Sequence, residues 1–179
     1  MTPSTGIRAL DEQSMVAAFD PGAATGFAVA GSDGIVFSDQ GTPECVLQEW
    51  LPWVKATQKS RNLAGVVVES TFVGAGAHAS LHVTEAAGFV CGALWAAGIR
   101  VPIWRWNAGS WRSRCGMKVT TRNPKTNKSR RLKGNELIDH EVEFIREVTG
   151  RTYARSDQHR VEAMMMALAG WAEYIRAAA

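Results

Sequence analysis

Short apolar runs separated by turn residues make up the first part of this chain, and helical periodicity takes over later. Residues 15–19, 26–30 and 34–38 are the first three runs, and glycine-containing turns separate them. This spacing predicts three strands in an antiparallel meander. Residues 43–57 follow with the spacing of an amphipathic helix, whose predicted buried side carries Val46, Leu47, Trp50 and Val54.

The middle of the chain predicts two more strands with a helix between them. Residues 63–68 and 101–104 are apolar runs of strand length, and residues 81–97 have helical spacing. Small residues recur at every fourth position of this helix and let another backbone approach closely. We expect that backbone to belong to the sheet, with a partner helix as the alternative. The small residues are Thr84, Gly88 and Gly92.

The order of these elements predicts a single α/β domain. Residues 134–148 and 157–176 are the last predicted helices, and residues 120–133 before them predict a long ribbon or an irregular segment. A meander followed by β-α-β crossovers gives a mixed five-stranded sheet with helices on both faces. This order is similar to that of the RNase H-like fold. We expect a flexible tail over residues 1–13 and one domain over 14–179, with a basic loop at about 114–134.

Composition changes this picture little. The chain is 46% hydrophobic and 21% charged, as in ordinary globular proteins. No apolar run is long enough to span a bilayer, and the first residues lack the charged-then-apolar pattern of a signal peptide. Cys45, Cys91 and Cys115 have no C-x-x-C spacing, so they predict neither a disulfide scaffold nor a structural zinc site. We therefore expect a cytoplasmic protein.

Charge is distributed unevenly along the chain. The net charge is only +3, but residues 105–135 contain ten Lys or Arg and no Asp or Glu. Trp104, Trp106 and Trp111 lie at the start of this stretch, and positive charge combined with aromatic rings suits a polyanion with exposed bases. A solvated loop is the alternative. The predicted DNA-binding residues here are Arg112, Arg114, Lys118, Arg122, Lys125, Lys128, Arg130, Arg131 and Lys133.

Acidic residues stand where predicted strands end. Asp20 closes the run at 15–19, before a Pro-Gly turn, and Glu69 closes the run at 63–68. His159 and Glu162 are three residues apart at the start of the last helix, so they share a helix face. If that helix packs on the sheet, all four side chains meet at the strand ends. Asp157 or Ser156 suits the N-cap of this helix, so we keep Asp157 only as a second-choice ligand.

This set of side chains suits hard divalent cations. Carboxylate oxygens are the ligands that Mg²⁺ and Mn²⁺ prefer, and both ions also bind phosphate oxygens. Two such ions about 3.5–4 Å apart can stabilise the attacking and the leaving oxygens of a phosphodiester. We therefore predict that Asp20, Glu69, His159 and Glu162 are both metal ligands and catalytic residues, and that His159 either binds metal or relays protons.

Each of these residues also has a structural alternative. Asp20 could form an Asx-type turn, and Glu69 could pair with a cation such as Arg61 at the surface. His159 could be a structural histidine, and Glu162 could be an exposed helix residue paired with a nearby arginine. The joint placement of the four favours the metal site.

These motifs resemble those of the RuvC-type Holliday-junction resolvases. The matching residues are Asp20-Pro21-Gly22 with Thr25-Gly26, then Val66-Val67-Val68-Glu69, then His159-x-x-Glu162-Ala163. The resemblance covers roughly residues 15–175. It implies an RNase H-like homodimer that uses Mg²⁺ or Mn²⁺ to make paired nicks in a four-way DNA junction. It also implies that Phe72, three residues after Glu69, contacts junction bases, whereas a core position is the alternative.

The chain departs from that family pattern at two places. The last acidic position, usually Asp in the family, is Glu162 here, and one extra methylene changes the reach of the ligand. The basic segment 118–133 is longer and more charged than the family pattern, which either extends the DNA contact or marks another branched substrate. Three other functions remain open: an RNase H-like nuclease for other DNA or RNA substrates, a non-catalytic nucleic-acid-binding protein, and an ATP-binding enzyme. The last needs two such subdomains, and this chain has length for one.

Overall fold

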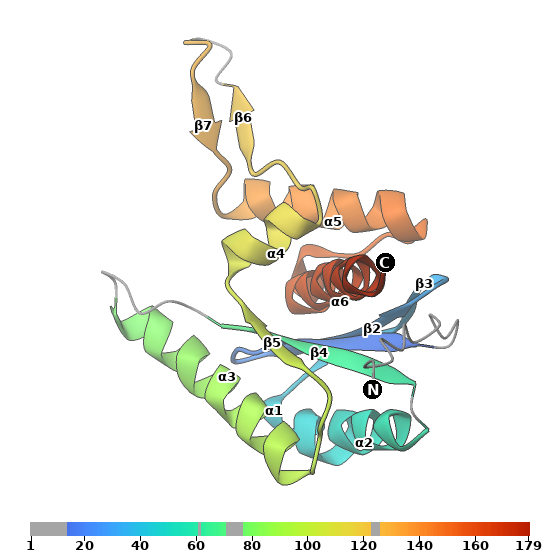
Figure 1. The fold of residues 1–179 in the computed structure, drawn as a ribbon. Helices are drawn as coiled ribbons and strands as arrows, with labels where there is room; N and C mark the ends of the chain where they lie inside the picture. The colour runs from blue at the N-terminus through green and yellow to red at the C-terminus, as the bar shows by residue number, and fades with distance from the viewer. Residues whose placement is uncertain (1–13, 61, 71–76, 123–125) are drawn as a thin grey trace, which may run out of the picture.

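A five-stranded sheet forms the centre of the domain. The computed structural model describes residues 14–60, 62–70, 77–122 and 126–179 (Figure 1). The strands lie in the order β3-β2-β1-β4-β5. They are β1 (Met15–Asp20), β2 (Thr25–Gly31), β3 (Gly34–Gly41), β4 (Leu63–Glu69) and β5 (Ile103–Trp106).

The pairing of the strands confirms the predicted mixed sheet. β1 and β2 pair antiparallel, as do β2 and β3, so the first three strands form the expected meander. β4 pairs parallel with β1 on one side and with β5 on the other. The parallel ladders place the carboxyl ends of β1, β4 and β5 at one edge of the sheet.

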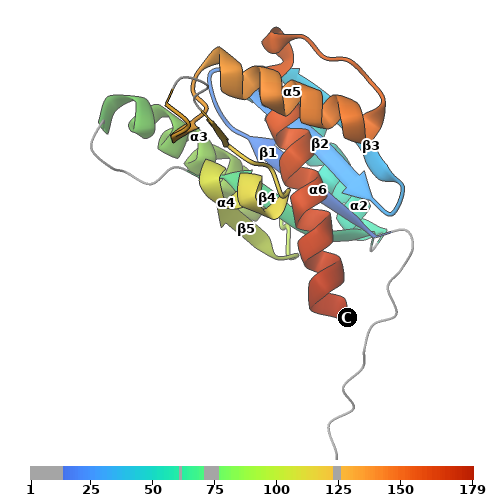
Figure 2. The same cartoon turned by 90° about the horizontal axis from the view of Figure 1, so that it is seen from above.

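Helices cover both faces of the sheet (Figures 1 and 2). The helix predicted over 43–57 runs through α1 (Pro43–Cys45), a π-helical turn η1 (Val46–Trp50) and α2 (Leu51–Lys59). Together with α3 (Ala77–Ala96), it lies on one face. The other face carries α6 (Gln158–Ala178), against which α4 (Ala108–Arg114) and α5 (Asn135–Thr149) pack.

Each face of the sheet has its own hydrophobic core, because side chains alternate along a strand. Phe19 and Phe27 point to the face covered by α1 to α3 and pack with Trp50. Small residues such as Ala18 and Ala28 point to the other face, where the methionines of α6 fill the space. Gly170 completes this fit, since a Cβ there would lie 2.7 Å from Val67 and 2.8 Å from Val16.

Two predictions about exposed helix residues were wrong. Leu47 was placed on the buried side of its helix but is exposed, while Val46, Trp50 and Val54 are buried as predicted. Gly88 and Gly92 do not pack against the sheet, because a Cβ at either position would meet nothing within 4 Å. The close approach that these glycines permit is therefore not used within the described part of the chain.

The basic segment forms a β-hairpin that projects from the domain (Figure 1). Its strands are β6 (Thr120–Arg122) and β7 (Ser129–Arg131), so the ribbon alternative holds. Trp106 and Trp111 before it are buried in the α6-side core and are not a DNA-stacking surface, and Trp104 is partly buried against the same core. Among the described helices, none combines the length and hydrophobicity that a membrane span requires.

Candidate active site at the carboxyl ends of the strands

Two strands bring Asp20 and Glu69 to the α6 side of the sheet. Ala18 in β1 faces that side, and Asp20 follows two residues later, so strand alternation points its side chain the same way. Val67 and Glu69 stand in the same relation in β4. Because Phe19 pairs with Val68 in the parallel ladder, the two acidic residues end their strands side by side.

A close contact between β2 and α6 brings the other two residues to this edge. A Cβ on Gly26 would lie 1.9 Å from the backbone carbonyl oxygen of His159, so only glycine permits this approach. The Gln40 side chain ties the same turn to β3: its Nε2 donates to the Ser156 carbonyl at 3.0 Å, and its Oε1 accepts from the Arg160 backbone N–H at 3.2 Å. The start of α6 is therefore fixed against β2 and β3.

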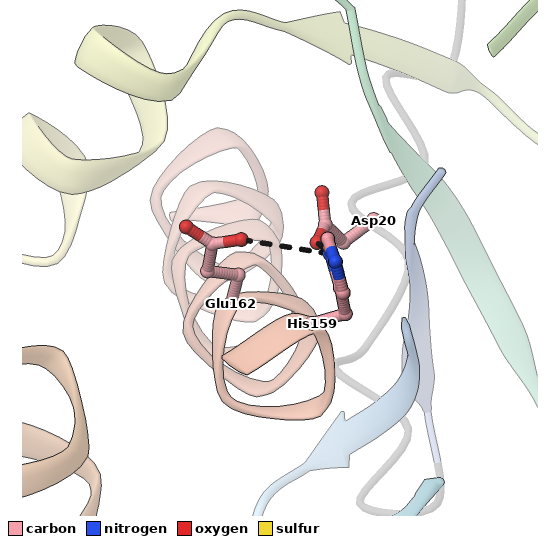
Figure 3. A group of neighbouring side chains, drawn as sticks. All are labelled: Asp20, His159 and Glu162. Atoms are coloured by element: carbon pink, nitrogen blue, oxygen red, sulfur yellow. Dashed lines mark hydrogen bonds and ion pairs between the residues drawn. The ribbon is translucent and has the colours of Figure 1, made fainter. Parts of the chain in front are cut away.

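The structure brings Asp20, His159 and Glu162 into one group (Figure 3). Nδ1 of His159 lies 2.6 Å from Oδ2 of Asp20 and 4.0 Å from Oε2 of Glu162. Each residue offers one ligand atom, and these atoms all lie within 4.8 Å of one another. Glu69 is not part of this group, but its carboxylate is close enough to interact with that of Asp20.

Burial and mutual repulsion make these carboxylates costly when they are ionised. Asp20, Glu69 and Glu162 are 3%, 8% and 6% exposed. Burial, the charge of Glu162 and a hydrogen bond with Glu69 raise the pKa of Asp20 well above its usual value. Burial also raises the pKa of Glu69. A bound divalent cation would compensate this concentrated negative charge, so the donor set fits Mg²⁺ or Mn²⁺.

Asp157, the second-choice ligand, lies outside the group. It ends the 3₁₀ turn η2 (Arg155–Asp157), and its Oδ2 accepts a hydrogen bond from the backbone N–H of Ala154 at 2.9 Å. Asp157 holds the N-cap position of α6, as predicted, but its side chain makes no capping hydrogen bond to that helix. The residue organises the turn that leads into His159.

Arg112, predicted to bind DNA, is instead buried beside the acidic group. Its Nε donates to Oε1 of Glu141 at 2.6 Å, and its NH2 group donates to Oε1 of Glu162 at 2.9 Å. Sequence reasoning also missed Glu141, which is 1% exposed. One signal was available: Glu141 lies four residues after Leu137 and four before Ile145, so a carboxylate interrupts the apolar side of α5.

The basic hairpin separates its arginines by face. Opposed residues of a ladder share a face, so Arg131 with Thr120 and Arg122 with Ser129 lie on one face, and Arg130 with Thr121 lies on the other. Arg130 forms a two-bonded ion pair with Glu136 at the start of α5, both bonds being 2.7 Å. The other predicted residues here are exposed, and Arg114 also lies over the Trp106 ring; they are Arg114, Lys118, Arg122, Lys128, Arg131 and Lys133. Phe72 and Lys125 fall outside the described residues.

Solved structures supply the comparison that identifies the fold. RuvC from Thermus thermophilus, alone and in complex with a Holliday junction substrate, matches with a TM-score of 0.56 and 19% identity over 91% of this chain and 96% of that chain. The chain has the RuvC fold. The RNase H-like architecture predicted from the element order is thereby confirmed. The yeast mitochondrial Holliday junction resolvase Ydc2 matches with a TM-score of 0.46 and 12% identity, over 96% of this chain and 84% of that one. No family model and no curated protein sequence matches the chain.

Proposed function

We propose that this protein is a metal-dependent nuclease that cleaves four-way DNA junctions. The observation that carries the proposal is the group of buried carboxylates at the strand ends of a RuvC fold, with Asp20 and Glu162 on either side of His159. The Thermus thermophilus protein with this fold is seen bound to a Holliday junction substrate. A purely DNA-binding protein would have no need for ionisable groups buried at such a cost.

The acidic side chains and His159 have different proposed roles in the reaction. Asp20, Glu69 and Oε2 of Glu162 would hold divalent cations, which supply activation of the attacking water and stabilisation of the leaving oxygen when bound. The two strand-end carboxylates are fixed by the sheet, so the scissile phosphate meets a preorganised set of ligands. His159, hydrogen-bonded to Asp20, either completes the ligand set or takes up a proton at Nε2, its second ring nitrogen.

The exposed arginines of the hairpin are the proposed DNA contacts outside the active site. Arg122 and Arg131 share one face of the β-ribbon, and no ion pair occupies either of them among the described residues. Neutralising backbone phosphates needs only such accessible positive charge. Arg130 is held by Glu136 and serves instead to orient the ribbon on α5.

A homodimer is part of the proposal, because a near-two-fold junction needs two equivalent sites. The surface we assign to it lies on α3. Gly88 and Gly92 share a face of that helix with Leu81 and Trp95, both large apolar residues that are exposed, Trp95 to 74%. A second copy of the helix packed there would cover these side chains and use the space above the glycines.

The test is incubation with a synthetic four-way junction in Mg²⁺, Mn²⁺ or EDTA, with the nick positions mapped. We expect metal-dependent nicks placed symmetrically about the crossover, and no cutting by Asp20→Asn or Glu162→Gln although both variants still bind the junction. Cleavage of flap, duplex and RNA–DNA hybrid substrates is measured in parallel. Faster cleavage of one of these would leave the nuclease assignment in place and change the substrate, whereas cutting by both variants would refute the active site.

A further inference from the structure

We propose that Glu141 is a positioning residue for the candidate metal site and that it acts through Arg112 on Glu162. The inference rests on the proposed function, because it concerns how one of the proposed ligands is oriented. Glu141 belongs to α5, Arg112 to α4 and Glu162 to α6, so the three side chains join the helices that cover this face of the sheet. None of the three was linked to the others by the sequence motifs.

The two oxygens of Glu162 have different surroundings. Oε1 accepts from the Arg112 NH2 group at 2.9 Å and lies 3.4 Å from Nε2 of Gln158. Oε2 lies 4.0 Å from Nδ1 of His159, on the side that faces His159 and Asp20 (Figure 3). Arg112 therefore holds one oxygen and leaves the other directed at the place where a cation would bind.

Arg112 by itself would be a poor neighbour for a cation. Its guanidinium is buried. If Glu162 were its only partner, this positive charge would neutralise the Glu162 carboxylate and repel a metal cation. Glu141 supplies the counter-charge when it is ionised. It accepts from Nε of Arg112 at 2.6 Å, so the fork of Arg112 is divided between two carboxylates. The positive charge of Arg112 is then shared by two carboxylates and is not directed at Glu162 alone.

Glu141 pairs with Arg112 through only one of its two oxygens. Its Oε2 is buried and has no hydrogen-bond partner among the described residues. Leaving a carboxylate oxygen unsatisfied in the interior costs free energy, and apolar residues in place of buried ion pairs are often neutral or stabilising. A group retained at such a cost, one side chain away from the acidic group, points to the site rather than to the fold.

The first experiment measures Mn²⁺ binding by isothermal titration calorimetry without DNA. Glu141→Gln keeps the shape and the acceptor oxygen but removes the charge, and we expect Mn²⁺ affinity to fall about 10–100-fold, as for residues that orient metal ligands. Glu143→Gln is the matched control, since Glu143 lies on the same helix in an exposed ion pair with Arg146; it should bind Mn²⁺ like the wild type. Wild-type affinity in Glu141→Gln would overturn the proposal.

The second experiment separates positioning from stability. The double variant Arg112→Met/Glu141→Leu removes both buried charges, so its thermal stability should equal or exceed that of Glu141→Gln. If Glu141 acts by positioning, Mn²⁺ affinity stays at least tenfold below the wild type; if the cluster is only structural, affinity returns with stability, and the proposal is wrong. Asp20→Asn is the reference for the site itself. Wild-type Mn²⁺ binding by Asp20→Asn would refute the metal site, whereas its loss together with normal binding by Glu141→Gln would refute the positioning role alone.

Discussion

Replacing Gly26 by alanine tests how α6 is held at the strand ends. The new Cβ would lie 1.9 Å from the carbonyl oxygen of His159 and 2.3 Å from the carbonyl carbon. Cβ contacts in proteins stay at 3.0 Å or beyond, so the first turn of α6 must move away by about 1.1 Å, since packed interiors absorb overpacking by backbone shifts. His159 and Glu162 would move with that turn, while Asp20 stays on β1.

Two measurements follow from this displacement. Overpacking of this kind costs about 1–3 kcal/mol, so urea unfolding should show a loss of stability in that range. A misplacement of about 1 Å in a catalytic group costs about 100-fold in rate, and we expect kcat/KM for junction cleavage to fall by about that factor. Mn²⁺ affinity should fall as well, because the three ligand atoms no longer converge.

Gly88→Ala is the matched control for this change. The same methyl group meets nothing within 4 Å there, and alanine is the better helix former by about 1 kcal/mol. Because Gly88 belongs to the proposed dimer face, the control readout is metal binding: its Mn²⁺ affinity should equal that of the wild type. If Gly26→Ala also kept wild-type stability and Mn²⁺ affinity, α6 would not approach β2 as described, and the geometry of the site would be wrong.

Three further expectations concern DNA, assembly and pH. Arg122→Ala with Arg131→Ala should reduce the slope of log K against log salt for junction binding by about 1–2, whereas Arg130→Ala should leave the slope nearly unchanged; equal effects would show that the ribbon faces are not distinct. Gly92→Arg should convert a dimer into a folded monomer in sedimentation velocity; an unchanged sedimentation coefficient would exclude this face of α3. Burial raises the pKa of Glu141 to about 7. The protonated side chain therefore contributes about 3 kcal/mol to the stability of the fold below about pH 4.5, and this contribution is lost as pH rises through 7. The measurement is made in EDTA, so that no metal ion is bound. The stability of the wild type relative to Glu141→Gln should therefore fall over that pH interval, and a flat difference would contradict the shift.

The fold was largely predictable, because its signals are local. The meander follows from short apolar runs between glycine turns, and strand alternation explains why Asp20 and Glu69 reach the same face. The His-x-x-Glu spacing alone places His159 and Glu162 on one helix face, and the structure has Nδ1 of the first 4.0 Å from Oε2 of the second. For these residues, the two-residue repeat of a strand and the 3.6-residue repeat of a helix are enough to predict which side chains share a face.

The interactions that sequence reasoning missed are tertiary. Arg112 was assigned to DNA from the charge of its segment, and nothing local reveals that two carboxylates from other helices hold it in the interior. The α3 glycines were assigned to the sheet, although small residues mark a close approach without naming the partner. Leu47 is exposed because a π-helical turn changes the periodicity on which its predicted burial depended.

A crystal structure with Mn²⁺, using anomalous scattering to locate the ion, tests the central claim most directly. The account predicts an anomalous peak between Oδ2 of Asp20 and Oε2 of Glu162, within coordination distance of both oxygens and absent from crystals of Asp20→Asn. A peak elsewhere on the protein, with Asp20 and Glu162 left free of metal at saturating Mn²⁺, would contradict it.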